Sequence, residues 1–221
     1  MDIKSAFESV GGIFLCEEDE LKRKLGSIRA FVLDWDGVFN EGRKESDHGS
    51  TFSEPDSMGL NMLRFSHWLN NRELPKTAII SGAANETAIT FAKREHFDYV
   101  MINSKNKIDA FHLFCDKNGV NYNEVLFVFD DILDLRLAEL CGVSICVKRG
   151  ASPLFTNHVQ QRQLAAYITG HSGGQHAIRE VCEMIVGLIG QYTLCIDERV
   201  AFTDTYREYW DLRQKTDTII G

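Results

Sequence analysis

Short apolar runs alternate with longer amphipathic segments along the chain from Phe31 onward. Apolar runs of this length predict buried strands, and the segments between them have the spacing of helices. Strands that alternate with helices are typical of a parallel sheet covered on both faces. We therefore predict an α/β fold with a Rossmann-like, doubly wound parallel sheet. The expected strands are AFVLDW (30–35), TAIISG (77–82), DYVMIN (98–103), VLFVFD (125–130) and VSICVK (143–148).

Helical patterns follow the later strands. The expected helices are NETAITFAKREHF (85–97), KIDAFHLFCDKNG (107–119) and DILDLRLAELCG (131–142). Gly119 and Gly142 are both placed to end their helices in a left-handed turn before the next strand. Between the first two strands, SMGLNMLRFSHWLNN (57–71) also has helical spacing, and the preceding GRKESDHGSTFSEP (42–55) contains an HGS turn. That turn predicts a small β-hairpin, in a segment too short for an inserted second domain.

The chain has a formal net charge of −8, so its surface is acidic on balance. This charge disfavours nucleic acid and anionic membranes as partners. The amino terminus has no basic start followed by a long apolar run, and no apolar stretch reaches the length that spans a bilayer. We therefore expect a soluble, cytoplasmic protein. The six cysteines form no CxxC pair, which favours reduced thiols over a zinc site or a disulfide framework.

Polar side chains follow the expected strands at the point where each strand ends. In chain order they are Asp34 and Asp36, Ser81, Lys107, and Asp130 and Asp131. In an open parallel sheet, ligands bind beyond the carboxyl ends of the strands. We therefore expect these side chains to converge on one edge of the sheet.

An acidic cluster of this kind needs a counter-charge, because neighbouring carboxylates disfavour each other's ionised forms. A hard divalent cation such as Mg2+ supplies that charge and also binds phosphate oxygens. Ser81, the backbone N–H groups of the helix that begins after Gly82, and the ammonium of Lys107 suit a phosphoryl group. The constellation therefore predicts a phosphate and metal site.

The spacing of Asp34 and Asp36 gives the two acids separate roles. A carboxylate directly at a strand end can attack phosphorus as a nucleophile. A second carboxyl two residues further on points the same way and can give a proton to the leaving oxygen. Gly37 follows, and it lets the backbone turn tightly beside the phosphate.

The order of these residues resembles the motifs of the haloacid dehalogenase superfamily of aspartyl-phosphate phosphatases. The first motif, DxDG, stands here as DWDG, the second as IISG with Ser81, the third as Lys107 in SKNKIDAF, and the fourth as FDDILD. PDSMGLNML, SKNKIDAF and GGQHAIREVCEMIV further resemble the capless branch that removes phosphate from 3-deoxy-octulosonate 8-phosphate and related nonulosonate 9-phosphates. The resemblance implies a phosphomonoesterase that acts on a phosphorylated sugar acid.

Carried over residue by residue, the resemblance implies a Mg2+ site. Asp34 would be the nucleophile and a metal ligand, and Asp36 would be the general acid and base and lend its backbone carbonyl to the metal. Asp130 would complete the protein ligands. Asp131 and Asp134 would either support these ligands from behind or cap the following helix, and the sequence leaves both readings open.

The resemblance covers roughly residues 28–190 and implies that Ser81, Gly82 and Lys107 hold the phosphoryl oxygens. In that family the fold is Rossmann-like. The resemblance also implies a homotetramer in which the hairpin of one subunit covers the site of another.

Both ends of the chain extend beyond the resemblance. Residues 1–27 form an expected N-terminal extension with a short helix over about 17–25, where acids come first and bases last. Residues 191–221 form an expected C-terminal extension with a helix, in which FTDTYREYWDLRQ carries an aromatic stripe. The stripe needs a partner in the same subunit or a neighbour, and we interpret it as a subunit contact.

Three positions depart from the family pattern. Phe129 stands where the family usually has glycine, Ala83 replaces the arginine of ISGR, and His176 replaces a glycine in the GGxGA element. These changes affect substrate contacts more than phosphoryl chemistry. Arg179 and Glu180, which follow, are read either as a surface ion pair or as substrate contacts.

Two other functions would use similar residues. A non-catalytic relative would bind a sugar phosphate or partner a sugar-activating enzyme, but intact Asp34, Asp36, Lys107 and Asp130 speak against it. A phospho-accepting receiver domain also places acids, a lysine and Mg2+ on a doubly wound sheet. That class would have adjacent acids at its first strand end, whereas DWDG separates them. We therefore favour the phosphomonoesterase.

Overall fold

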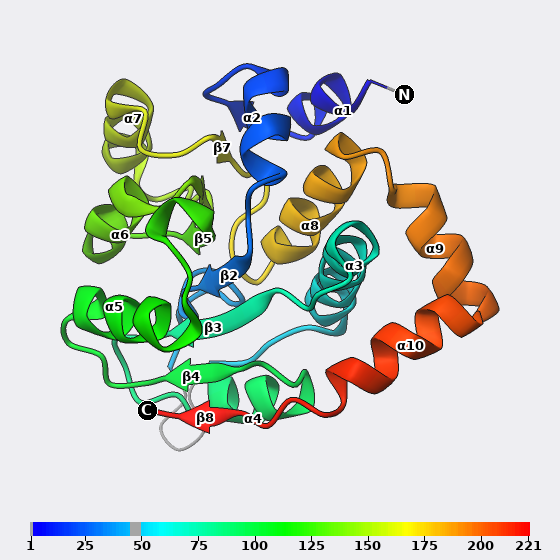
Figure 1. The fold of residues 1–221 in the computed structure, drawn as a ribbon. Helices are drawn as coiled ribbons and strands as arrows, with labels where there is room; N and C mark the ends of the chain where they lie inside the picture. Colours follow the sequence, from blue (N-terminus) through cyan, green and yellow to red (C-terminus); the bar gives the residue numbers. More distant parts are fainter. Residues whose placement is uncertain (1, 45–49) are drawn as a thin grey trace.

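A computed structural model describes residues 2–44 and 50–221 of the chain (Figure 1). Its strands are β1 (Ile13–Phe14), β2 (Ala30–Leu33), β3 (Lys76–Ile80), β4 (Tyr99–Met101), β5 (Val125–Phe129), β6 (Val143–Cys146), β7 (Tyr167–Ile168) and β8 (Ile219–Ile220). They form one eight-stranded sheet in the order β1-β7-β6-β5-β2-β3-β4-β8. The pairs are parallel except β1 with β7, which is antiparallel. The prediction of a doubly wound, Rossmann-like α/β fold is confirmed.

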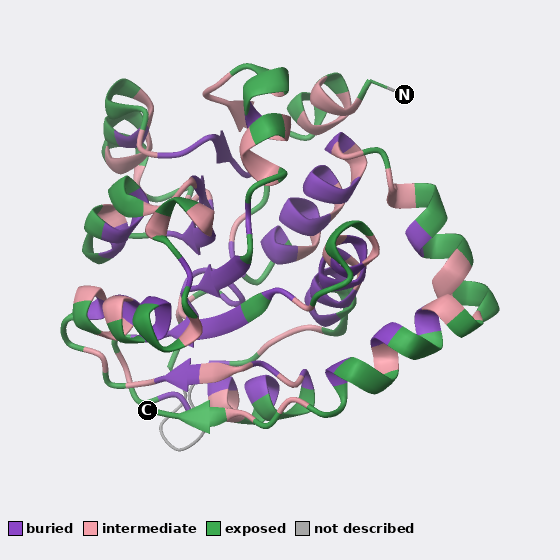
Figure 2. Cartoon of the chain, in the orientation of Figure 1, coloured by how far each residue is buried: buried purple, intermediate pink, exposed green. Residues whose placement is uncertain are grey.

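Helices cover both faces of the sheet. They are α1 (Ile3–Ser9), α2 (Glu18–Leu25), α3 (Glu54–Asn71), α4 (Glu86–Arg94), α5 (Lys107–Asn118), α6 (Leu135–Leu140), α7 (Pro153–Arg162), α8 (Ala177–Leu188), α9 (Tyr192–Ala201) and α10 (Asp204–Arg213), with short 3-10 turns η1 (Tyr122–Glu124) and η2 (Ile132–Asp134). Successive strand residues point to opposite faces, so the sheet builds two cores. On β2, Phe31 and Leu33 face the core under α3, α4 and α8, whereas Ala30 and Val32 face the core under α5, α6 and α7. Figure 2 shows the central strands buried between these layers.

Local sequence signals set the ends of the helices that carry site residues. α5 begins at Lys107 because the side chain of Asn106 accepts a hydrogen bond from the backbone N–H of Ile108, at 3.3 Å. It ends before Gly119, which adopts the predicted left-handed conformation with a φ of 61°. The same prediction for Gly142 was wrong, because Gly142 has no positive φ; it packs closely against the backbone of Asn123 instead. α3 begins after Ser53, whose hydroxyl accepts from the N–H of Asp56 at 3.3 Å.

Both ends of the chain add a strand to the sheet, which the sequence did not indicate. β1 pairs with β7 at one edge, and β8 pairs with β4 at the other. The predicted short N-terminal helix is present as α2. In the C-terminal extension, Tyr206 and Tyr209 are fully buried and their rings contact Phe65 and Trp68 of α3. The aromatic stripe therefore packs within the chain, and a subunit contact by this extension stays a prediction.

The predicted β-hairpin falls partly on residues 45–49, which lie outside the described residues. The flanking residues 41–44 and 50–53 are not in strands. The hairpin therefore stays a prediction. In the described part of the chain, no helix is long and apolar enough to cross a membrane. All six cysteines are free; Cys115, Cys146, Cys182 and Cys195 are buried, and Cys16 and Cys141 are partly exposed.

Candidate active site

The predicted site residues meet at the carboxyl edge of the central strands. Asp34 follows β2, Lys107 opens α5 just after β4, and Asp130 follows β5. These three side chains line an open cavity of about 320 Å3, together with Asp36 and Gly82. The parallel register of β2 with β3 and β5 brings the strand ends side by side, so residues far apart in sequence become neighbours.

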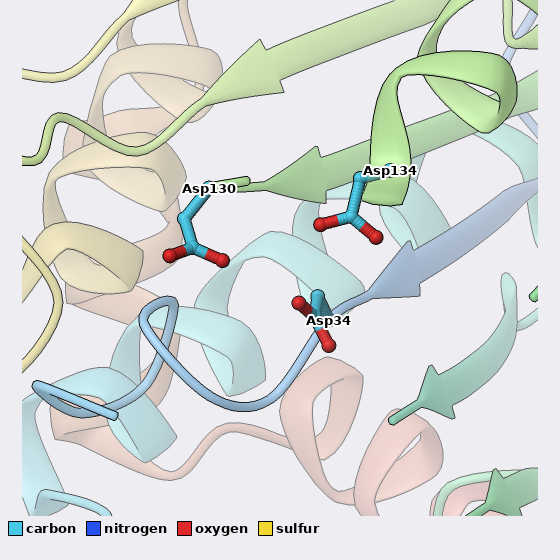
Figure 3. A group of neighbouring side chains, drawn as sticks. All are labelled: Asp34, Asp130 and Asp134. Atoms are coloured by element: carbon cyan, nitrogen blue, oxygen red, sulfur yellow. The ribbon is translucent and has the colours of Figure 1, made fainter. Parts of the chain in front are cut away.

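Three carboxylates form an acidic cluster in this cavity, and the residues are Asp34, Asp130 and Asp134. One ligand oxygen of each lies within 4.8 Å of the others. Figure 3 shows the three carboxyl groups around one small space beyond the ends of β2 and β5. Burial raises the pKa of Asp34 well above its usual range, and the charge of Asp134 adds to this effect. Burial likewise raises the pKa of Asp130 to about 6. The cluster therefore favours binding of positive charge, as protons or as a cation.

The donor set of the cluster fits a hard divalent cation. Carboxylate oxygens are the ligands that Mg2+ prefers in proteins. Oδ2 of Asp134 is buried and has no hydrogen-bond partner among the described residues. A cation in the cluster would satisfy this oxygen and offset the repulsion between the acids. Asp134 therefore lies beside the expected ligands Asp34 and Asp130. The sequence had left two roles open for Asp134, either support of these ligands from behind or a cap of the following helix.

Lys107 is the counter-charge that the cluster already contains. Its Nζ lies 2.9 Å from Oδ1 of Asp34 and 2.6 Å from Oδ1 of Asp134. Burial alone would lower the pKa of Lys107, but the two carboxylates raise it above its usual value. The side chain therefore remains an ammonium, fixed at the base of the cavity beside the predicted nucleophile.

Asp36 points to a different set of partners. Its carboxylate accepts hydrogen bonds from Ser50 Oγ, from Asn85 Nδ2 at 2.8 Å, and from Lys44 Nζ. Burial acts to raise the pKa of Asp36, but the bonds from Lys44, Ser50 and Asn85 outweigh it and hold the pKa below its ordinary value. The pKa of Asp34 is thus raised and that of Asp36 lowered, the reverse of the order that an ionised nucleophile and a protonated acid require. A cation bound at the cluster would favour the ionised form of Asp34.

Asn85 is a site residue that the sequence reasoning missed. It is fully buried, and its Nδ2 donates to Ser81 Oγ at 2.8 Å as well as to Asp36. Asn85 therefore connects the predicted phosphate-binding serine to the predicted general acid. In the sequence, the position of Asn85 just before α4 indicated only the start of a helix. Ser50 and Lys44 were missed as well, because both reach Asp36 from the loop after DWDG.

Gly37 is required by the close packing at the end of β2. Its φ is +83°, and a Cβ at this position would collide with the carboxylate of Asp130 and the guanidinium of Arg149. Arg149 is the remaining missed residue of the cavity. It follows β6 and donates a hydrogen bond from Nη2 to Oδ2 of Asp130. Nothing in the VKRG sequence indicated that contact.

The other predicted residues take clear positions. Asp131 is exposed, and its carboxylate accepts from the N–H of Ile132 at 2.7 Å, so it caps η2. Phe129 is fully buried in the core, and Ala83 lines the cavity without any charge. His176 has a positive φ of 65°, and its Nδ1 lies 3.1 Å from Ser53 Oγ. Of these three departures, Ala83 is the one that lines the cavity, whereas Phe129 lies in the core and His176 directly precedes α8.

Glu180 is neither half of a surface ion pair nor a residue lining the cavity of the predicted catalytic residues. It is 7% exposed and accepts hydrogen bonds from Tyr167 Oη, Gly170 N and His171 N at 2.6–2.9 Å. Arg179 pairs with Glu183, so the reading of an Arg179–Glu180 ion pair was wrong, and substrate contact by Glu180 stays a prediction. Glu180 lies in α8, but its hydrogen-bond partners precede the helix, and helical periodicity does not reveal such contacts. Glu180 holds the loop whose Gly173 packs against the backbone of Gly37.

Replacing Glu180 by Gln is expected to lower the free energy of unfolding by about 2–3 kcal/mol, because an amide turns one acceptor oxygen into a donor that faces other donors. Glu183→Gln is the matched control on the same helix. Glu183 pairs with Arg179 at 2.6 Å on a partly exposed surface and should lose less than about 1 kcal/mol. Urea unfolding measures both changes. Equal losses would show that Glu180 does not anchor the loop.

The chain is similar to curated phosphatases. It is 26% identical over 171 residues to 3-deoxy-D-manno-octulosonate 8-phosphate phosphatase from Escherichia coli (strain B / BL21-DE3). The aligned region covers 76% of this chain and 84% of the relative. The phosphatase of the same name from Yersinia pestis is 24% identical over 172 residues, with 76% and 84% covered. No family model matches the chain.

Solved structures give the same result. The 3-deoxy-D-manno-octulosonate 8-phosphate phosphatase from Moraxella catarrhalis, in complex with magnesium ion, phosphate ion and KDO, matches with a TM-score of 0.67 and 26% identity, over 85% of this chain and 100% of that one. A HAD superfamily (subfamily III A) hydrolase from Legionella pneumophila matches with a TM-score of 0.67 and 26% identity, over 83% and 95%. The sheet order, the motif residues at its carboxyl edge and these similarities together support a phosphatase of the haloacid dehalogenase type that resembles the 3-deoxy-D-manno-octulosonate 8-phosphate phosphatases.

Proposed function

We propose that this protein is a Mg2+-dependent phosphomonoesterase that hydrolyses a phosphorylated sugar acid of the 3-deoxy-octulosonate 8-phosphate or nonulosonate 9-phosphate type. The observation that carries the reaction is the position of Asp34, which lies inside the acidic cluster and 2.9 Å from Lys107. The substrate class is supported by the names of the relatives in sequence and structure. The proposal includes a homotetramer, which the family resemblance implies, and a cytoplasmic location, which the sequence predicts.

The first half of the reaction forms an aspartyl-phosphate. A carboxylate oxygen of Asp34 attacks phosphorus, and the bond between phosphorus and the ester oxygen breaks. Asp36 gives its proton to that leaving oxygen, which departs as the hydroxyl of the sugar acid. Ser81, Gly82 and Lys107 hold the phosphoryl oxygens during the transfer.

The second half returns the site to its starting state. A water molecule attacks phosphorus while Asp36 accepts one of its protons, and the bond from phosphorus to Asp34 breaks. Inorganic phosphate leaves, Asp34 is again a carboxylate, and Asp36 again carries a proton. The bonds from Lys44, Ser50 and Asn85 lower the pKa of Asp36, so they favour the ionised form that exists between the two halves.

Mg2+ has a defined place in this scheme. Asp34, Asp130 and the backbone carbonyl of Asp36 would hold it, and Asp134 contributes a further oxygen to the same cluster. When bound, the ion supplies positive charge that offsets the charge of the phosphoryl group.

A panel of phosphomonoesters tests the proposal. We expect phosphate release to require Mg2+, to stop with EDTA, and to be fastest, by kcat/KM, with 3-deoxy-octulosonate 8-phosphate or a nonulosonate 9-phosphate. Faster turnover of simple hexose phosphates would contradict the substrate class and leave the reaction standing. Metal-independent release would contradict the role of the acidic cluster.

A further inference from the structure

Arg149 is a charged residue of the active-site cavity that the proposed mechanism does not use. It lies in the segment after β6 and lines the same cavity as Asp34, Lys107 and Asp130. Its Nη2 donates to Oδ2 of Asp130, and 39% of its side chain is exposed. The Arg149 side chain is therefore held by Asp130 at one end and remains partly accessible to solvent.

Most of the hydrogen-bonding capacity of Arg149 is unused. A guanidinium carries five N–H donors in a rigid fork, and the bond to Asp130 is the one that Arg149 makes within residues 2–44 and 50–221. Lys107, the other cation in the described wall of the cavity, is already engaged by Asp34 and Asp134. Lys107 thus keeps one of its three N–H donors for a ligand, whereas Arg149 keeps most of its five within the described residues.

The two cations lie at different parts of the cavity wall. Lys107 lies next to Gly82, where a Cβ would be 4.0 Å from Lys107 Cε. Arg149 instead lies over the turn after β2, where a Cβ on Gly42 would be 3.9 Å from Arg149 Nη2. A ligand with one anionic group would need only one of these places. A ligand with two separated anionic groups would use both.

We propose that Arg149 is a specificity residue that binds a second anionic group of the substrate, a carboxylate, while the phosphoryl group lies beside Lys107. The fork of a guanidinium matches the two oxygens of a carboxylate, and the bond to Asp130 fixes its orientation in advance. The site thereby selects phosphorylated acids over the corresponding neutral phosphorylated sugars. This inference depends on the proposed phosphomonoesterase function and adds the residue that reads the acid.

Equilibrium binding of two matched esters tests the inference. Gluconate 6-phosphate and sorbitol 6-phosphate have the same carbon chain and differ at one end, where a carboxylate replaces a hydroxymethyl group. Calorimetry in the presence of Mg2+ gives Kd for each, in the Asp34→Asn protein, which would bind the esters without turning them over. The measured quantity is the ratio of the two Kd values, because any effect of Arg149 on Asp130 changes both esters equally.

Adding Arg149→Met should raise the Kd of gluconate 6-phosphate by at least a tenfold larger factor than the Kd of sorbitol 6-phosphate. Arg149→Lys should raise the Kd of gluconate 6-phosphate by an intermediate factor. Arg162→Met, an exposed arginine at the end of α7, is the matched control and should leave the ratio unchanged. An equal change for both esters in Arg149→Met would overturn the inference while sparing the proposed function. Failure of the Asp34→Asn protein to bind gluconate 6-phosphate would also overturn the inference, whereas the panel of phosphomonoesters tests the proposed function separately.

Discussion

Replacing Asp34 by Asn is expected to lower kcat for phosphate release by about three orders of magnitude or more, for every phosphomonoester that the protein hydrolyses. An amide oxygen is a far weaker nucleophile than a carboxylate, so the aspartyl-phosphate cannot form at a useful rate. The substitution keeps the size of the side chain, and Lys107 retains its 2.6 Å contact with Asp134. The fold should therefore survive, which circular dichroism would show.

Asp131→Asn is the matched control for this experiment. Asp131 is also an aspartate at the carboxyl edge, but it is exposed and caps η2. Its variant should retain kcat within about twofold, because a neutral Asn still caps a helix. Retention of a tenth or more of the activity in Asp34→Asn would contradict the nucleophile assignment, and an equal loss in both variants would point to a general disturbance of the edge.

Lys107→Met should damage both catalysis and stability. The side chain is 8% exposed and holds two buried carboxylates, so removing its charge leaves Asp34 and Asp134 without their counter-ion. Breaking a buried ion pair by deleting one partner lowers the free energy of unfolding by about 3–5 kcal/mol. Loss of a positioned cation at the phosphoryl group lowers kcat by about two to three orders of magnitude.

Urea unfolding and phosphate-release kinetics measure the two effects of Lys107→Met separately. Lys105→Met is the control, since Lys105 is exposed in the same loop and should change either quantity little. Added Mg2+ should restore part of the lost stability, because the cation supplies charge to the same acids. A Lys107→Met protein as stable as the native one in the absence of Mg2+ would show that Lys107 does not balance the cluster.

Topology explains why the central residues of the site could be predicted. Asp34, Lys107 and Asp130 each follow an apolar run that reads as a strand, and a parallel sheet brings the carboxyl ends of such strands together. No knowledge of loop shape was needed for these residues. The roles of Asp131 and Asp134 depended on the short turn η2, which the helical pattern did not reveal, and there the sequence left two readings open.

Residues held by loops and by short elements could not be predicted. Asn85, Ser50 and Arg149 reach the acids through turns whose conformation depends on tertiary contacts. β1 and β8 contain two residues each, too few to show any period. The aromatic spacing of α10 correctly indicated a packed face, but periodicity alone does not say whether the partner belongs to the same chain.

The two added strands determine how copies of this protein can associate. A long exposed edge strand is a template for pairing with another sheet, and very short edge strands are one way in which proteins avoid it. Here β7 and β4 are covered by the two-residue strands β1 and β8. Beside β8, the N–H of Gly221 donates to the carbonyl of Val100, and its carbonyl accepts from the N–H of Ile102, so a neighbouring strand cannot use these groups. Short strands at both edges therefore disfavour growth of a continuous sheet from one copy to the next. We expect contacts between copies to be made by helices, loops or the predicted hairpin, and an engineered contact should be placed there.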